Sequence, residues 1–193
     1  MFNWSAFLTY IIVASITPGP NNIVALSNGT RLGWRSGLPY LVGQQLAQWT
    51  LINGCMFAFR SLNSLLPRLT PVMRVVGAVY ILYLAWKTFR SGDDVESGES
   101  HASFRSGFAL QFVNPKLYLY IFATAQVYIL PGFSHRPAAM LGLGTVMTLC
   151  CGICSLCWLI GGSLFRRVLC RWGRAVNVAM ALLLAYCAVS MFL

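Results

Sequence analysis

Acidic residues are nearly absent from this 193-residue chain, which has four Asp and Glu beside 14 Lys and Arg. All four lie between Asp93 and Glu99, in a stretch that also contains Ser and Gly. The rest of the chain therefore offers no carboxylate for acid–base catalysis, for binding a hard metal ion or for carrying a proton through a membrane. We expect no catalytic residues, no metal site and no cofactor.

Long apolar runs dominate the composition instead. Apolar residues make up 58% of the chain and the mean hydropathy is +0.67. Such a chain is predicted to be an all-α integral membrane protein. The formal charge of +10 would suit a nucleic-acid partner in a soluble protein, but here the basic residues stand at the ends of apolar runs. We interpret them as topology signals, and expect the lipid bilayer and no nucleic acid as a partner.

The apolar runs predict six transmembrane helices joined by short connections. Their approximate ranges are 5–28, 38–59, 71–89, 106–130, 138–165 and 175–193. Three runs lie on each side of the acidic stretch. We therefore expect two three-helix repeats, residues 1–90 and 106–193, joined by a solvated cytoplasmic linker at 91–105.

The distribution of basic residues predicts the orientation of these helices. Nine basic residues border the first, third and fifth connections, whereas four border the second and fourth. The nine are Arg31, Arg35, Lys87, Arg90, Arg105, Arg166, Arg167, Arg171 and Arg174, and the four are Arg60, Arg68, Arg74 and Arg136. The side with more basic residues is expected to be cytoplasmic. Both termini then face outward, into the periplasm if the cell is a Gram-negative bacterium.

A helix-breaking motif lies inside the first apolar run rather than between runs. Pro18 and Pro20 lack an N–H and obstruct the preceding turn, and Gly19 can adopt dihedrals that other residues avoid. Pro18 lies roughly 16 Å along the run, about half the thickness of a hydrocarbon core. Released backbone groups are tolerated there only if protein buries them or they line a wet cavity, so the break is a candidate binding site. The alternative is a simple proline kink, which Asn21 and Asn22 make less attractive.

The fourth apolar run carries a second break, at Asn114, Pro115 and Lys116. Lys116 lies roughly 15 Å along this run, again near mid-depth, where an ammonium is costly. In one interpretation it attracts a substrate carboxylate, helped by N–H groups where the helices restart. In the other it snorkels or pairs with carbonyl groups freed by the breaks. Matching breaks in helices that enter from opposite sides are typical of the inverted repeats of secondary transporters.

Other side chains in the apolar runs extend this hypothesis. Gln111 offers an amide contact, and Trp158 offers an aromatic face to an amine, although packing also explains Trp158. Gln44 and Gln48 share one helix face, where they either line the pathway or hydrogen-bond neighbouring helices. The predicted substrate-binding set is Pro18, Gly19, Pro20, Asn21, Asn22, Gln111, Asn114, Pro115, Lys116 and Trp158.

The chain has seven cysteines, which raises the question of a redox or metal site. Cys150, Cys151, Cys154 and Cys157 include two C-x-x-C spacings, which occur in zinc and redox sites. They lie in an uncharged apolar run, where a cysteine behaves as a small hydrophobe and no reactive thiolate is indicated. We therefore expect them to pack.

Several motifs resemble those of the LysE/RhtB superfamily of amino-acid exporters. They are Thr17-Pro18-Gly19-Pro20-Asn21-Asn22, Gly29-x3-Gly33-x-Arg35-x-Gly37, Tyr80-x5-Trp86-Lys87, the run from Ala109 to Lys116, and the ending that starts at Asn177. The resemblance spans the whole chain. It implies a transporter, not an enzyme, that exports small neutral amino acids such as cysteine and O-acetylserine through a bacterial inner membrane.

The mechanism we expect is alternating access about a midplane site, with the two halves rocking against each other. The resemblance suggests coupling to protons, but no obvious carboxylate carrier is present, so facilitated efflux stays open. The oligomeric state, including a homo-oligomer, also stays open.

A membrane thiol-disulfide electron carrier of the cytochrome-biogenesis type is the alternative from another class, because such carriers look similar in architecture. They place a redox cysteine beside the broken region of each half. Neither break here carries a cysteine, which favours the exporter.

We predict that the C-terminus faces outward. A C-terminal alkaline phosphatase fusion should be active and a C-terminal green fluorescent protein fusion should be dark, because each reporter folds on one side of the membrane only. The same reporters placed after Arg90 serve as a control and should give the opposite pattern. Fluorescence from the C-terminal fusion would contradict the predicted orientation.

Overall fold

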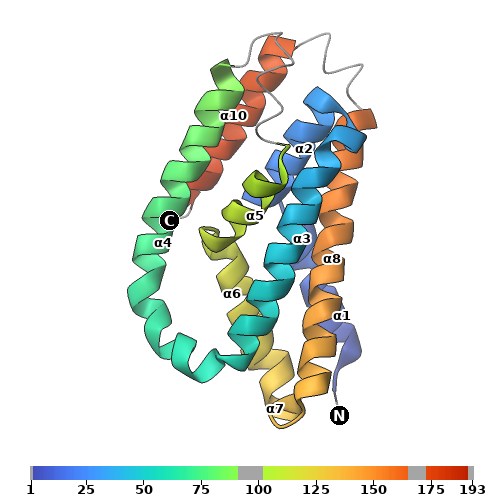
Figure 1. Cartoon of the computed structure of the whole chain (residues 1–193), viewed down its shortest axis with the longest axis vertical. Coiled ribbons are helices and arrows are strands. Elements are labelled where there is room, and N and C mark those ends of the chain that lie inside the picture. Colours follow the sequence, from blue (N-terminus) through green and yellow to red (C-terminus); the bar gives the residue numbers. More distant parts are fainter. Residues whose placement is uncertain (1, 91–101, 165–172, 191–193) are drawn as a thin grey trace.

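The structure is a computed structural model that describes residues 2–90, 102–164 and 173–190 (Figure 1). Within these ranges the secondary structure is helical and contains no strand, so the predicted all-α class is confirmed. The four acidic residues and most of the predicted linker at 91–105 lie outside them. The linker and the division into two repeats therefore stay predictions.

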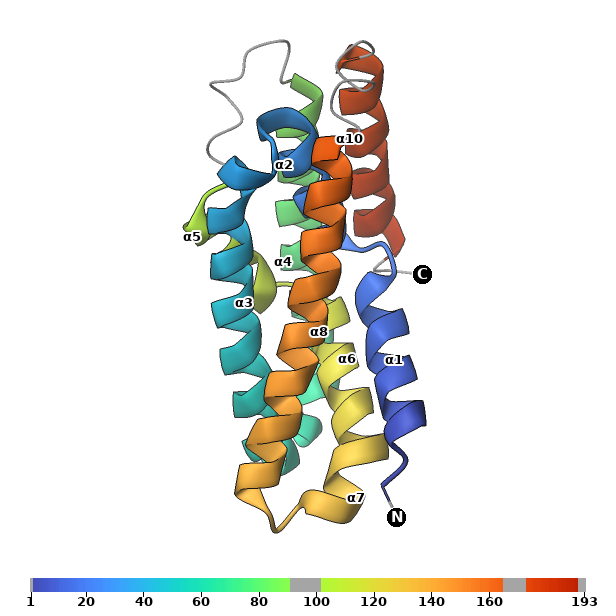
Figure 2. The same cartoon turned by 90° about the vertical axis from the view of Figure 1, so that its right-hand side faces the viewer.

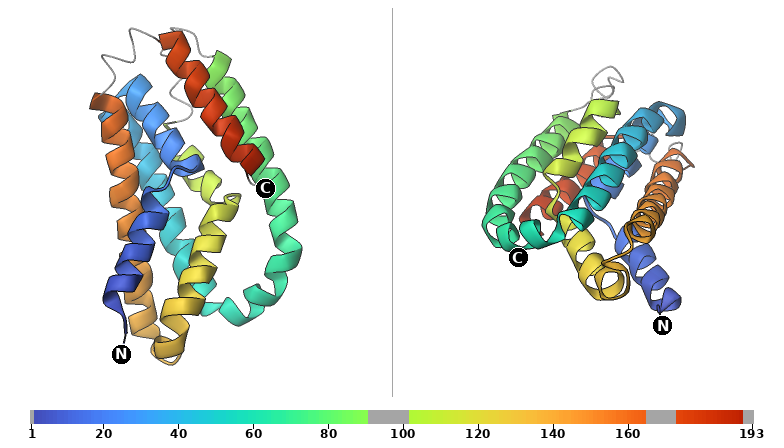
Figure 3. Two further views of the ribbon diagram at one scale, coloured as in Figure 1. Left: turned by 180° about the vertical axis from the view of Figure 1, so that it is seen from behind. Right: turned by 60° about the horizontal axis from the view of Figure 1, so that its bottom comes forward.

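Within each described range, short connections separate successive helices. The part before the acidic stretch contains α1 (Trp4–Ile16), α2 (Pro20–Leu32), α3 (Trp34–Phe57) and α4 (Phe59–Arg90). The part after it contains α5 (Phe104–Phe112), α6 (Pro115–Thr124), the π-helical turn η2 (Ala125–Ile129), α7 (Leu130–Phe133), α8 (Pro137–Leu164) and α10 (Gly173–Ser190). α4 and α10 pack side by side, as Figures 1 and 3 show.

Both predicted breaks are present. α1 ends at Ile16 and α2 begins at Pro20, while α5 ends at Phe112 and α6 begins at Pro115. Each new helix thus starts with a proline, whose missing N–H would have no helical partner at that position and whose fixed φ suits a helix. The two broken segments run in opposite directions, and both breaks lie near the middle of the bundle (Figures 1 and 2).

The predicted connection between the second and third helices is wrong. The sequence analysis placed it at about 60–70, but α4 begins at Phe59, directly after the end of α3, and continues to Arg90. Pro67 and Pro71 lie inside α4. An internal proline bends a helix without always ending it, and Figure 1 shows α4 curving at the end nearest α3.

One helix in the described ranges is long and apolar enough to cross a membrane by itself, namely α8 with 28 residues. The break divides the first apolar run into helices of 13 residues each. α3 carries buried amides, including Gln44, Gln48 and Asn53, which lower its hydropathy. The number of spans therefore stays a prediction from the sequence.

Apolar side chains form two buried clusters. One gathers residues of α1, α3, α6, η2 and α8, with Phe7 and Ile121 fully buried in it. The other gathers residues of α2, α3, α4, α5, α8 and α10, with Tyr40 and Leu110 fully buried in it. Because the first cluster takes in α1 and α6 and the second takes in α2 and α5, each break marks the passage of the chain from one cluster to the other.

α2 and α8 approach each other backbone to backbone. A Cβ atom on Gly29 would collide with the carbonyl oxygen of Leu159, and one on Gly162 would collide with the carbonyl oxygen of Leu26. Small residues permit such close contacts between membrane helices. The two glycines therefore fix how closely the first half of the chain packs on α8.

α3 and α5 repeat this arrangement. A Cβ atom on Gly43 would collide with the carbonyl oxygen of Phe104, and one on Gly107 with that of Tyr40. Both glycine contacts thus join a helix of the first half to a helix of the second half.

Gly162→Ala should destabilise the protein, because the new methyl group meets the backbone of α2. Overpacking of this kind typically costs about 1–3 kcal/mol. Gly161→Ala is the matched control, since nothing lies within 4 Å of a Cβ atom there. Thermal unfolding in detergent should show a lower midpoint for Gly162→Ala and an unchanged or higher one for Gly161→Ala. Equal midpoints would contradict the close contact.

Candidate functional site

The end of α1 releases carbonyl groups that have no partner within the helix. Asn22 Nδ2 donates to the carbonyl oxygens of Ser15 at 2.7 Å and Thr17 at 3.1 Å. Asn22 Oδ1 accepts from Ser155 Oγ at 3.0 Å, and Ser155 Oγ accepts from Gln44 Nε2 at 2.8 Å. All three side chains are buried. This chain of polar groups attaches the broken end of α1 to α2, α8 and α3.

Two side chains from the second half of the chain complete this end of α1. Trp158 Nε1 donates to the carbonyl oxygen of Ile16 at 3.1 Å, and Lys116 Nζ donates to that of Thr17 at 2.9 Å. A cation at the C-terminal end of a helix is also stabilised by the helix dipole. Lys116 therefore makes the contact of the second interpretation, in which its ammonium pairs with a freed carbonyl group.

These contacts bear on two expectations. Trp158 uses its N–H to cap α1 and does not line the cavity described below. The carbonyl groups of Ser15, Ile16 and Thr17 already accept hydrogen bonds from the protein. The carbonyl oxygen of Thr17 accepts two bonds, which use both of its lone pairs, whereas those of Ser15 and Ile16 accept one each.

Asn21 and Gln111 join the two breaks directly. Asn21 Nδ2 donates to Gln111 Oε1 at 2.8 Å, and Gln111 Nε2 donates to Asn21 Oδ1 and to the carbonyl oxygen of Gly107, each at 3.0 Å. Gln111 is fully buried. The pair thus holds the start of α2 against α5, and the amide of Gln111 is used within the protein.

The starts of α2 and α6 differ in how they are capped. Asn114 Oδ1 accepts from the backbone N–H of Lys116 at 3.1 Å, so α6 is capped by its own residue. α2 follows Gly19, and no side chain caps it. The N–H groups of its first turn carry the positive end of the helix dipole, a preferred place for an anion.

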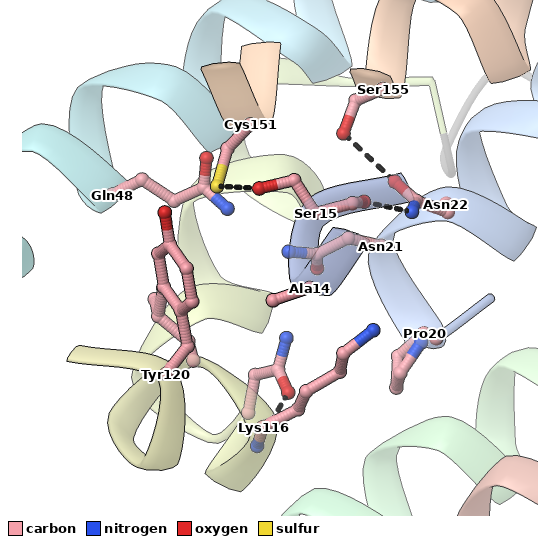
Figure 4. Close-up of a pocket in the computed structure, with 13 residues that line it drawn as sticks. Ala14, Ser15, Pro20, Asn21, Asn22, Gln48, Lys116, Tyr120, Cys151 and Ser155 are labelled. Carbon is pink, nitrogen blue, oxygen red and sulfur yellow. Dashed lines mark hydrogen bonds between the residues drawn. The ribbon is translucent and has the colours of Figure 1, made fainter. Parts of the chain in front are cut away.

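A cavity of about 50 Å³ lies against the first break, between α1, α2, α3, α6 and α8 (Figure 4). It is lined by Ala14, Ser15, Gly19, Pro20, Asn21, Asn22, Gln48, Asn114, Lys116, Leu117, Tyr120, Cys151 and Ser155. Such a volume holds a few water molecules. A small amino acid would need nearby side chains to move, and a large one would need larger movements.

The cavity brings together most of the predicted site residues. Gly19, Pro20, Asn21, Asn22, Asn114 and Lys116 line it, whereas Pro18, Gln111, Pro115 and Trp158 do not. Of the two glutamines with open roles, Gln48 lines the cavity and Gln44 serves as the hydrogen-bond donor to Ser155. Whether any of these residues binds a substrate stays a prediction.

The sequence analysis missed four polar residues of the lining. They are Ser15, Tyr120, Cys151 and Ser155. Tyr120 follows Lys116 by one helical turn, and Cys151 and Ser155 are also four residues apart, so each pair shares a helix face. That spacing is the signal that could have identified them once Lys116 was singled out.

The cysteines that the structure describes do not gather into a metal site. Cys151 lines the cavity, where its Sγ lies 3.2 Å from Ser15 Oγ. The described residues contain no group of three or more His, Cys, Asp and Glu side chains close enough to hold a metal ion. Cys170 lies outside the described residues.

The cavity therefore combines one ammonium, one uncapped helix start and several neutral polar groups, with no carboxylate in its lining. This arrangement can hold an anion such as a carboxylate.

Comparison with known proteins identifies the family. A family model described as "LysE type translocator" matches residues 12–193. The cysteine/O-acetylserine efflux protein of Salmonella typhimurium (strain LT2) is 36% identical over 189 residues, which cover 97% of this chain and 96% of that protein. The protein of the same name from Escherichia coli (strain K12) is 35% identical with the same coverage. No solved structure matches this chain significantly. The chain belongs to the LysE family of membrane transporters.

Proposed function

We propose that the protein exports small neutral amino acids, such as cysteine and O-acetylserine, from the cytoplasm through a bacterial inner membrane. The family and the names of the two relatives support amino-acid efflux. The observation that carries the proposed site is the ammonium of Lys116 beside a small cavity, at a helix start that no side chain caps. The size of the cavity favours small substrates.

The substrate carboxylate binds between Lys116 and the first turn of α2. An ammonium has three donors, and one of them reaches Thr17, so two remain for a carboxylate. Thr17 keeps its bond from Asn22 when Lys116 turns away. A Cβ atom on Gly19 would lie 3.0 Å from both Cδ and Nζ of Lys116, tighter than most side-chain contacts. Gly19 thus gives Lys116 room to lie across the break.

Alternating access about this site is the mechanism we propose. The two broken segments run antiparallel (Figure 1), which fits inverted repeats formed by residues 1–90 and 106–193. The glycine contacts between α2 and α8 and between α3 and α5 would have to separate when the cavity opens on their side. The described residues include no Asp or Glu side chain that could carry a proton. Facilitated efflux and proton exchange are therefore both open, and the vesicle experiment below distinguishes them.

Uptake into inverted membrane vesicles tests the proposed function. Labelled O-acetylserine, cysteine, serine, threonine and lysine are compared, with and without an imposed pH gradient. We expect uptake of the small neutral amino acids above that of vesicles lacking the protein, and little uptake of lysine. A preference for lysine, or no uptake of any of them, would contradict the proposal. Stimulation by the pH gradient would establish proton exchange.

Lys116→Ala should abolish most transport while leaving the fold intact. Losing a charged hydrogen bond costs about 1.5–3 kcal/mol, which is about 10- to 100-fold in binding. The variant removes an ammonium from the membrane interior, and the carbonyl oxygen of Thr17 keeps its bond from Asn22, so the stability should hold. Lys116→Arg should not restore transport fully, because its planar fork places donors differently. Arg105→Ala, an exposed change on α5, is the control and should transport normally.

Cysteamine, which is cysteine without the carboxylate, shows whether Lys116 acts by binding the substrate carboxylate or by stabilising the fold. The wild type should discriminate strongly against cysteamine in competition with cysteine, and Lys116→Ala should discriminate weakly. Transport by Lys116→Ala at the wild-type rate, or an unfolded variant in detergent, would show that Lys116 is structural.

Replacing all seven cysteines by serine should leave transport largely intact. Only Cys151 among the described cysteines lines the cavity, and serine keeps a group that can hydrogen-bond Ser15. Uptake of O-acetylserine, which has no thiol, is the measurement, and size-exclusion chromatography in detergent checks the fold. A folded but inactive variant would favour the thiol-disulfide electron carrier instead.

A further inference from the structure

A hydroxyl group without a partner lies in the wall of the cavity. Tyr120 is 7% exposed, and its Oη has no hydrogen-bond partner among the described residues. It lies beside Ser15 and Cys151, which pair with each other, without reaching hydrogen-bond geometry with either. A buried polar group left unpaired costs about 1–3 kcal/mol. A ligand that bonds Tyr120 Oη would recover this free energy.

Tyr120 and Lys116 line the same cavity from one helix, α6. The two residues are four apart on α6, one turn, or about 6 Å along the axis. Figure 4 shows the side chain of Lys116 extending toward Pro20, while the hydroxyl of Tyr120 is directed toward Gln48 and Cys151. An amino acid whose carboxylate lies at Lys116 and whose side chain extends along this cavity meets the wall that Tyr120 forms.

We propose that Tyr120 Oη, supported by Ser15 Oγ and Cys151 Sγ, forms a subsite for the polar γ-atom of the substrate. This atom is the sulfur of cysteine, the hydroxyl oxygen of serine or the ester oxygen of O-acetylserine. The inference rests on the proposed function, because it requires an amino acid whose carboxylate lies at Lys116.

The chemistry of a phenol suits this range of ligands. A tyrosine hydroxyl both donates and accepts. It accepts from a thiol or a hydroxyl, and it donates to an ester oxygen that has no proton to give. An apolar side chain of the same size would leave Tyr120 Oη unpaired, and a site built to hydrogen-bond its ligand discriminates against such an analogue. The subsite thus selects a polar γ-atom rather than a thiol in particular.

Competition between serine and 2-aminobutyrate tests the subsite, because a methyl group replaces the hydroxyl at nearly constant size. Inhibition of labelled O-acetylserine uptake into inverted vesicles gives an inhibition constant for each competitor. The wild type should favour serine. Tyr120→Phe removes only the hydroxyl and should reduce this preference about 3- to 10-fold, the usual worth of a neutral hydrogen bond.

Tyr118→Phe is the matched control. Tyr118 lies on the same helix, its Oη donates to the carbonyl oxygen of Phe112 at 3.4 Å, and it does not line the cavity. The Tyr118→Phe variant should prefer serine over 2-aminobutyrate to the same degree as the wild type.

Each outcome of this experiment decides the proposal. An unchanged preference in a transporting Tyr120→Phe variant overturns the subsite and leaves the proposed function standing. Equal inhibition of the wild type by serine and 2-aminobutyrate overturns it without any variant, so the test survives if Tyr120→Phe fails to fold. Absence of amino-acid uptake by the wild type overturns the proposed function and the subsite together.

Discussion

Backbone groups released at two helix breaks have to find partners inside the protein, and the rest of the structure depends on how they do so. The carbonyl group of Thr17 accepts from Lys116, and that of Ile16 accepts from Trp158. Asn21 of the first break pairs with Gln111 beside the second. Side chains of the second half thus satisfy carbonyl groups of the first break, and an amide pair joins the two breaks. These polar groups hold the two halves together, and two of them, Asn21 and Lys116, also line the cavity.

These hydrogen bonds between the two halves explain how a substrate site can exist with few charged side chains in its lining. Hydrogen bonds between helices in a membrane are individually modest, about 0.6 kcal/mol on average in one measured case. A few of them can therefore exchange for bonds to a substrate at moderate cost. The two helix starts differ, because Asn114 caps α6 whereas no side chain caps α2. The start of α2 is therefore the place where a substrate anion can bind the backbone N–H groups. Lys116 lies beside that uncapped start, so both favour the carboxylate.

Much of this arrangement follows from local sequence. Two prolines around Gly19, and the proline after Asn114, predict where the helices break, since proline restricts the backbone whatever surrounds it. The start of α4 was not predicted, because the two prolines Pro67 and Pro71 suggested the end of a helix, whereas in α4 they lie within one. Spacing also shows which residues share a helix face but not which neighbour that face meets. The roles of Trp158, Tyr120 and Cys151 depend on how α1, α6 and α8 are placed together, and a single sequence does not contain that placement.

Protection of Cys151 from a small thiol reagent tests most directly whether substrate occupies the cavity between the breaks. Cys151 lines that cavity and is buried, so a variant that retains it as the single cysteine reports access to the site. The rate of labelling by a methanethiosulfonate is measured with saturating O-acetylserine and with saturating lysine. The account predicts that O-acetylserine slows labelling strongly and lysine does not. Equal labelling rates with O-acetylserine and without any amino acid would contradict it.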